Sequence, residues 1–220
     1  MCKNRNSLLK KYRQIYLSED ILLEQLRIEH DKEPYTVKNY DKKKSNVCFI
    51  LSCPGREELI NNKPCSGNTG KNLNKLLQIL HQQRPDLFKF TDRYQYDILN
   101  TTEIVHFEAL DTETEGGKDE IDRGVKKILE YVDSNTNLAY MVLFGRKVKK
   151  IIKKLNYFIE EKNRVIYIID GEYHLSYRGL SKINKDIKDN FINKKNYPKS
   201  DERTNARLTV VADKIIKQLN

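Results

Sequence analysis

The sequence predicts an α/β fold, namely a three-layer α/β/α domain around a short, mostly parallel four-stranded sheet. From residue 47 onward, short continuous apolar runs alternate with longer amphipathic stretches. Strands of a parallel sheet read as continuous apolar runs, because helices cover both faces of the sheet. The chain of 220 residues is also long enough to bury a full core within one domain.

The expected strands are four apolar runs, which cover residues 47–52, 96–100, 138–144 and 164–169. The first reads VCFILS and is followed by Pro54 and Gly55, and this short length with an abrupt end favours a buried strand. Ligands of open parallel sheets bind in the crevice outside the carboxyl ends of the strands. We therefore expect the segments after Ser52, Asn100 and Ile169 to meet in space and to carry the chemistry.

The expected helices are the amphipathic stretches that separate and follow these runs. The clearest covers residues 69–83 and places four leucines on one face: Leu73, Leu76, Leu77 and Leu80. Further helices are expected over residues 119–133, 146–155 and 206–219. Residues 55–69 read as a loop, which begins at the sharp Pro54-Gly55 exit from the first strand.

The chain is expected to have two parts. Residues 1–46 read as a helical segment, over residues 5–30, followed by a polar connector, and both are expected to pack on the core. Residues 47–220 read as the α/β domain itself. No internal repeat is visible.

The charge balance favours a polyanionic partner. The chain has 41 Lys and Arg against 31 Asp and Glu, which gives a formal net charge of +10. Such a surface attracts polyanions, of which DNA and RNA are the commonest. A lysine-rich surface that is simply well solvated is the alternative.

Several classes of protein are not expected. No apolar run is long enough to span a membrane, and the N-terminus lacks the sustained apolar segment of a secretory signal. A cytoplasmic, monomeric protein is the expectation. The cysteines Cys2, Cys48, Cys53 and Cys65 form no CxxC pair, so reduced thiols are expected rather than a metal centre.

The loop after the first strand carries the strongest functional signal. Glu57 and Glu58 follow Pro54-Gly55, and Gly67 and Gly70 then lead into the leucine-rich helix. Glycines there permit close approach to a helix N-terminus, whose N–H groups suit a phosphate or a developing anion. An ordinary strand–loop–helix turn with solvated glutamates is the alternative.

This segment resembles the first motif of the uracil-DNA glycosylase superfamily. In that motif a strand runs into a Pro-Gly turn, an acidic residue follows, and a Pro-aromatic-x-Gly-x-x-Gly stretch opens a helix. The resemblance continues in order along residues 47–180, through Tyr96–Asn100, Met141–Gly145 and the His-x-Ser element His174–Gly179. It implies that family's fold and the hydrolysis of an N-glycosidic bond after the target nucleotide has been flipped out of DNA.

The resemblance also implies roles for individual residues. Asn100, whose side chain has both donors and an acceptor, would read the base edge, and His174 would donate to a base oxygen as negative charge develops. Glu58 matches the acidic position of the iron–sulfur branch, and either Glu58 or its neighbour Glu57 would orient the attacking water. Ser52 belongs with the base-binding residues. No metal or organic cofactor is implied.

Two positions depart from the family pattern. Cys53 stands immediately before the proline, where several branches have an Asp or Asn that activates water, and Cys65 replaces the aromatic ring that stacks on the flipped base. The loss of the ring opens space, which favours a bulky modified pyrimidine of the kind found in some phage genomes, and hence a defence role. Excision of uracil or another small deaminated base in base-excision repair is the alternative, as is loss of catalysis.

Basic residues near two of these motifs are the expected DNA contacts. A basic helix begins after the third strand, with Arg146 and Lys149 as its leading candidates. Ser176, with the amides near it, would bind a phosphate, and Tyr177 and Arg178 are placed for a groove or wedge contact. The same residues fit a catalytically silent nucleic-acid-binding module. A small-molecule or nucleotide-binding α/β protein is a third class, supported by the glycine-rich loop alone, which lacks the Lys-Ser/Thr of a P-loop.

Overall fold

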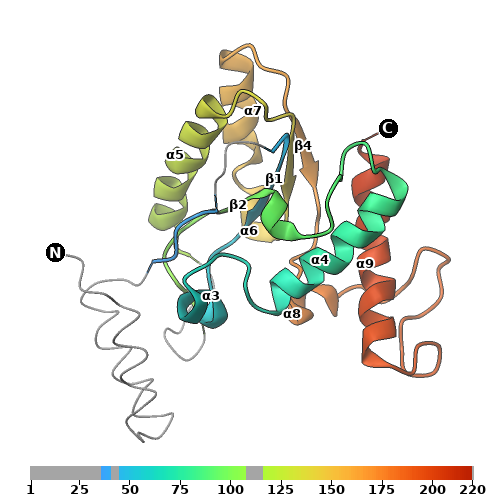
Figure 1. The fold of residues 1–220 in the computed structure, drawn as a ribbon. Helices are drawn as coiled ribbons and strands as arrows, with labels where there is room; N and C mark the ends of the chain where they lie inside the picture. Colours follow the sequence, from blue (N-terminus) through green and yellow to red (C-terminus); the bar gives the residue numbers. More distant parts are fainter. Residues whose placement is uncertain (1–35, 41–44, 108–115, 220) are drawn as a thin grey trace, which may run out of the picture.

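Four parallel strands form the sheet at the centre of the molecule (Figure 1). The computed structural model describes residues 36–40, 45–107 and 116–219. The strands are β1 (Val47–Leu51), β2 (Asp97–Asn100), β3 (Tyr140–Leu143) and β4 (Tyr167–Asp170), in the order β2-β1-β3-β4. Each neighbouring pair is parallel, so the predicted three-layer α/β/α fold is confirmed.

Helices cover both faces of this sheet. α4 (Asn68–Gln83) and α9 (Ser200–Lys217) pack together on one face, and α5 (Lys118–Ser134) and α7 (Ile152–Glu161) lie on the other (Figure 1). Four shorter helices lie in the connections: α3 (Arg56–Asn61), η1 (Arg93–Gln95), α6 (Arg146–Lys149) and α8 (Tyr177–Leu180). No helix within the described ranges combines the length and the apolar character needed to cross a bilayer.

The core has two halves, one on each face of the sheet. In β1, Phe49 and Leu51 belong to the half under α4 and α9, whereas Cys48 and Ile50 belong to the half under α5 and α7. Both sets are buried because the strand is covered on both sides. This double burial is the physical reason for the continuous apolar run in the sequence.

The two outer strands of the sheet, β2 and β4, each form hydrogen bonds with another segment. Tyr40 and Ile98 exchange two backbone hydrogen bonds of 2.8 Å, so the connector runs antiparallel beside β2. At the other edge, the Gln218 side chain accepts from the Asp170 N–H (2.9 Å) and donates to the Asp170 carbonyl (3.0 Å). One residue in each edge strand, Ile98 in β2 and Asp170 in β4, is therefore already paired.

The structure differs from the sequence expectation in three connections. Residues 55–69 contain the helix α3, in which no residue is buried, so an apolar period could not reveal it. The expected helix 146–155 is broken by a turn at Lys150 and Ile151 into α6 and α7. The short helix α8 is also additional to the expected elements. The helical segment expected over residues 5–30 lies outside the described residues.

Candidate functional site

The strand order reverses at the end of the sheet where β1 and β3 terminate, which we call the carboxyl edge. The chain passes from β1 to β2 on one side and later to β3 on the other side, so the strand order reverses between β1 and β3. Ligands of open α/β sheets bind at such a switch point, outside the carboxyl ends of the strands. Ser52 follows β1 here, and Gly145 lies just beyond β3.

The structure brings Ser52, Gly145 and His174 together at this point. Gly145 has φ +104°, and a Cβ on it would lie 3.4 Å from Ser52 Oγ and 3.4 Å from His174 Cδ2. The serine hydroxyl and the imidazole therefore border the same small space that the glycine leaves open. A side chain at position 145 would be strained and would fill that space.

The His174 ring is held by its own loop. Its Nδ1 accepts a hydrogen bond from the Ser176 N–H at 3.1 Å, so the neutral ring carries its proton on Nε2. The next carbonyl, that of Leu175, accepts from the Asn72 amide of α4 at 2.7 Å. Gly179 is required beneath the loop, because a Cβ there would lie 2.1 Å from the His174 carbonyl oxygen. The loop thus fixes the orientation of the ring and its tautomer.

Asn100 ends β2 and is 2% exposed. It pairs in register with Leu51, so its side chain shares the face of the sheet that α4 covers. Its backbone N–H donates to Asn39 Oδ1 at 2.8 Å, which fixes the end of the strand. Its side-chain Nδ2 is buried and has no hydrogen-bond partner among the described residues.

The side chain of Ser52 also has a buried polar atom without a hydrogen-bond partner. Its Oγ makes no hydrogen bond within the described part of the chain, although its carbonyl accepts from Thr101 Oγ1 at 2.6 Å. A buried polar group without a partner costs about 1–3 kcal/mol. Both atoms lie at the ends of adjacent strands, and a buried polar atom without a partner calls for a physical explanation.

The Glu58 carboxylate binds the N-terminal ends of both α3 and α4. Its two carboxylate oxygens accept from the Gly55 N–H (3.1 Å) and from the Gly67 N–H (3.2 Å). Gly55 and Gly67 are the N-cap residues of α3 and α4, so the carboxylate neutralises the free donors of both helices. Glu57 is exposed, and of the two glutamates it is the one whose carboxylate forms no hydrogen bond with another described residue.

Cys65 and Cys53 lie in different surroundings. Cys65 is 3% exposed and belongs to the core half under α4. Burial, and then the negative charge of Glu58, raises the pKa of its thiol to about 12, so the thiol is neutral at physiological pH. Its carbonyl fits against Gly70, where a Cβ would lie 1.7 Å from the oxygen. Cys53 is half-buried and directly follows Ser52.

The expected DNA contacts divide into exposed and ion-paired residues. Tyr177 is 70% exposed and Arg178 is exposed, and both project from α8 directly after the loop that holds His174. Ser176 caps this helix, because its Oγ accepts from the Gly179 N–H at 3.2 Å. Arg146 is exposed, whereas Lys149 is paired with Asp170 at 2.7 Å.

Sequence reasoning missed a pair of cations beside the loop between α3 and α4. Lys63 Nζ lies 3.4 Å from the centre of the Tyr94 ring, and the Arg93 guanidinium carbon lies 4.3 Å from it. Arg93 also lies against α4, because its backbone N–H donates to Asn74 Oδ1 at 3.0 Å. Only the fold brings these residues together, and no local pattern marks them. The same is true of Asn39, which supports Asn100.

Among the residues that the structure describes, no group of three or more His, Cys, Asp or Glu side chains could hold a metal ion. No protein-family model matches the chain, and no curated protein matches it.

Proposed function

We propose that this protein is a DNA glycosylase, which flips a modified or deaminated pyrimidine out of DNA and hydrolyses its N-glycosidic bond. The observation that carries the proposal is the pair of buried polar atoms without hydrogen-bond partners in the described chain, Ser52 Oγ, which lies beside His174, and Asn100 Nδ2 at the end of the neighbouring strand. The resemblance of the surrounding motifs to the uracil-DNA glycosylase superfamily adds the reaction class. The net charge of +10 fits a DNA substrate.

In this proposal Asn100 reads the flipped base. Its Nδ2 donates to a carbonyl oxygen of the pyrimidine, and its Oδ1 accepts from a ring N–H. The hydrogen bond from the Asn100 backbone N–H to Asn39 fixes the end of β2, from which the buried Asn100 side chain projects. Ser52 Oγ supplies a second polar contact from the neighbouring strand.

His174 then stabilises the departing base. As the bond between C1′ and the base nitrogen breaks, negative charge develops on the base, and the Nε2–H donates to an oxygen that carries it. Water adds to C1′ of the sugar, and its proton balances the charge of the released base. We assign the orientation of this water to Glu57 rather than to Glu58, because both oxygens of Glu58 already accept backbone N–H groups.

The substrate class is inferred from Cys65. Cys65 is smaller than the aromatic ring that the family pattern has at this position, whereas Cys53 replaces an Asp or Asn of similar size, and a bulky modified pyrimidine of phage type would take the place of the ring. This substrate places the enzyme in defence against phage. Uracil, with a role in base-excision repair, is the smaller alternative.

The test is base release under single-turnover conditions, followed as alkali-sensitive strand breaks. Asn100→Ala and His174→Ala should each lower the rate by at least 100-fold, because each removes an interaction made with the reacting base. Asn205→Ala, an exposed asparagine of α9, is the matched control and should release base at the wild-type rate. Wild-type rates in both site variants would overturn the proposal.

One observation favours a second candidate, a nucleic-acid-binding module without catalysis. Glu58, the acidic residue that matches the family motif, is occupied by two backbone donors. Glu57→Gln distinguishes the candidates: in a glycosylase it lowers the rate of base release and leaves DNA affinity unchanged. A protein that binds DNA and yields no alkali-sensitive sites, with or without this substitution, is the silent module.

A further inference from the structure

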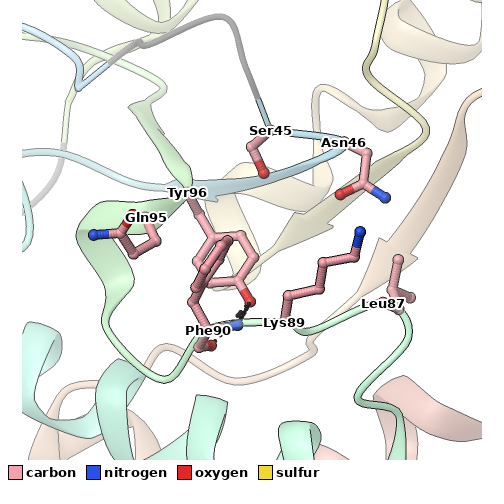
Figure 2. Close-up of a pocket in the computed structure, with 7 residues that line it drawn as sticks. All are labelled: Ser45, Asn46, Leu87, Lys89, Phe90, Gln95 and Tyr96. Atoms are coloured by element: carbon pink, nitrogen blue, oxygen red, sulfur yellow. Dashed lines mark hydrogen bonds between the residues drawn. The ribbon is translucent and has the colours of Figure 1, made fainter.

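A cavity of about 650 Å³ opens at the end of the sheet where β1 and β2 begin, which we call the amino edge (Figure 2). Its lining comes from three segments: the start of β1, the segment after α4 and the entry to β2. The lining residues are Ser45, Asn46, Leu87, Lys89, Phe90, Gln95 and Tyr96. Pockets of about 300–1,000 Å³ are the usual size of small-molecule sites.

Two aromatic rings form one wall of this cavity. The Phe90 ring is 49% exposed although the segment that carries it is fixed. Tyr96 fixes that segment, because its hydroxyl accepts from the Phe90 N–H and donates to the Phe90 carbonyl, both at 2.9 Å. The Phe90 and Tyr96 rings meet edge to face, and their centres lie 6.2 Å apart. A half-exposed ring on a fixed backbone is a ready surface for a planar partner.

The polar part of the cavity is positive. Lys89 is exposed, and among the described residues that line the cavity it is the only charged one. Figure 2 shows its side chain reaching toward the side chain of Asn46, across the opening from the rings. Within the described residues, Lys89 forms no ion pair. An anionic group placed between the ammonium and the amide would gain both a charge partner and a donor.

We propose that this cavity binds a planar aromatic ring that carries an anionic group, as a nucleoside monophosphate or an aromatic carboxylate does. The ring stacks on Phe90, and the anion lies between Lys89 and Asn46. This site is separate from the carboxyl-edge site and does not depend on the proposed glycosylase activity.

Calorimetric titration of the full chain with uridine 5′-monophosphate, uridine, inorganic phosphate and benzoate tests the proposal. The nucleotide should bind at least ten times more tightly than uridine or phosphate alone, because each lacks one of the two recognised groups. If benzoate binds as tightly as the nucleotide, the site recognises any aromatic ring that carries an anionic group. If the nucleotide binds more tightly than benzoate, the site recognises nucleotides. Equal binding of uridine, phosphate and the nucleotide would overturn the proposal.

Variants locate the binding. Phe90→Ala and Lys89→Gln should each weaken nucleotide binding about tenfold. Tyr157→Ala and Lys126→Gln remove a matched exposed aromatic and a matched exposed lysine elsewhere, and they should leave the affinity unchanged. Loss of binding in Asn100→Ala, with full binding in Phe90→Ala, would place the nucleotide at the carboxyl edge and contradict the proposal.

Discussion

At the scale of single residues, the site is recognised by polar atoms that the fold buries without partners. Asn100 Nδ2 and Ser52 Oγ both lack hydrogen bonds within the described chain, and they lie at the carboxyl ends of the neighbouring strands β2 and β1. Proteins keep such groups where the cost is offset by function, because apolar side chains of similar shape would be more stable. Stability and activity should therefore oppose one another at these positions.

Asn100→Leu tests this opposition directly. Leucine is close to asparagine in shape and removes the unpartnered amide, so the free energy of unfolding should rise by about 1–3 kcal/mol. The same variant should lose base release. Urea denaturation and the single-turnover assay measure the two effects. A destabilised Asn100→Leu protein would mean that the amide has a partner in the folded chain.

Cys65 gives a prediction for alkaline pH. The pKa of its thiol is raised in the folded chain from an ordinary value of 9.0 to about 12, chiefly by burial. A group whose folded pKa is raised stabilises the fold fully below its unfolded pKa, and this contribution is lost as pH rises toward the folded pKa. Stability should therefore fall between about pH 9 and pH 12.

Cys65→Ala isolates this contribution. The buried tyrosines Tyr96 and Tyr131 also have raised pKa values, so the wild-type protein loses stability from several groups over this range. The difference in unfolding free energy between wild type and Cys65→Ala removes the tyrosine part. That difference should shrink as pH rises above 9. A difference independent of pH would show that the thiol is not buried as described.

At the scale of elements, short helices rather than long ones present the expected DNA contacts. α8 places Arg178 and Tyr177 in solvent directly after the His174 loop, whereas α6 directs Lys149 to an ion pair with Asp170. A lysine that is already paired releases fewer counterions from DNA than an unpaired arginine does. The two positions should therefore differ in their effect on the salt dependence of binding.

Arg178→Gln should lower the slope of log affinity against log salt concentration by about 0.9, the value for one phosphate contact on duplex DNA. Lys149→Gln should lower it by less than half of that amount. Fluorescence anisotropy with a labelled duplex between 50 and 200 mM salt measures both slopes. A larger effect at Lys149 than at Arg178 would move the DNA surface from α8 to α6.

The elements also show which parts of the fold the sequence could predict. Strand β1 was predictable because both of its faces are buried, and α4 was predictable because Leu73, Leu76, Leu77 and Leu80 face one core half. α3 was not, because it buries no side chain and is held by the Glu58 carboxylate instead. A hydrophobic period reveals helices that bury one face, and it does not reveal helices that are held by polar contacts.

The same distinction applies to the candidate site. Ser52, Asn100 and His174 could be placed at one edge of the sheet, because parallel strands bring their carboxyl ends together and each residue follows or ends a strand. Asn39 and the pair of cations at Tyr94 could not, because they come from segments that meet only through tertiary packing. The binding of Glu58 to two helix starts likewise depends on the spacing of loops in three dimensions.

At the scale of the whole molecule, the carboxyl edge and the amino edge of the sheet carry two separate proposed sites. The carboxyl edge carries the buried polar atoms with His174, and the amino edge carries the cavity beside Phe90. The sheet and its helices hold the two about one strand length apart. Variants at one edge should therefore leave the other working, because distant sites without shared partners act independently.

The most direct test is mass spectrometry of bases released from genomic DNAs that differ in their pyrimidine modifications. The wild-type protein is predicted to release one modified or deaminated pyrimidine as the intact free base and to leave alkali-sensitive abasic sites. His174→Ala should bind the same DNA and release at most traces. Binding of every DNA without release of any base, or equal release by wild type and His174→Ala, would contradict the assignment of the carboxyl edge as a glycosylase site.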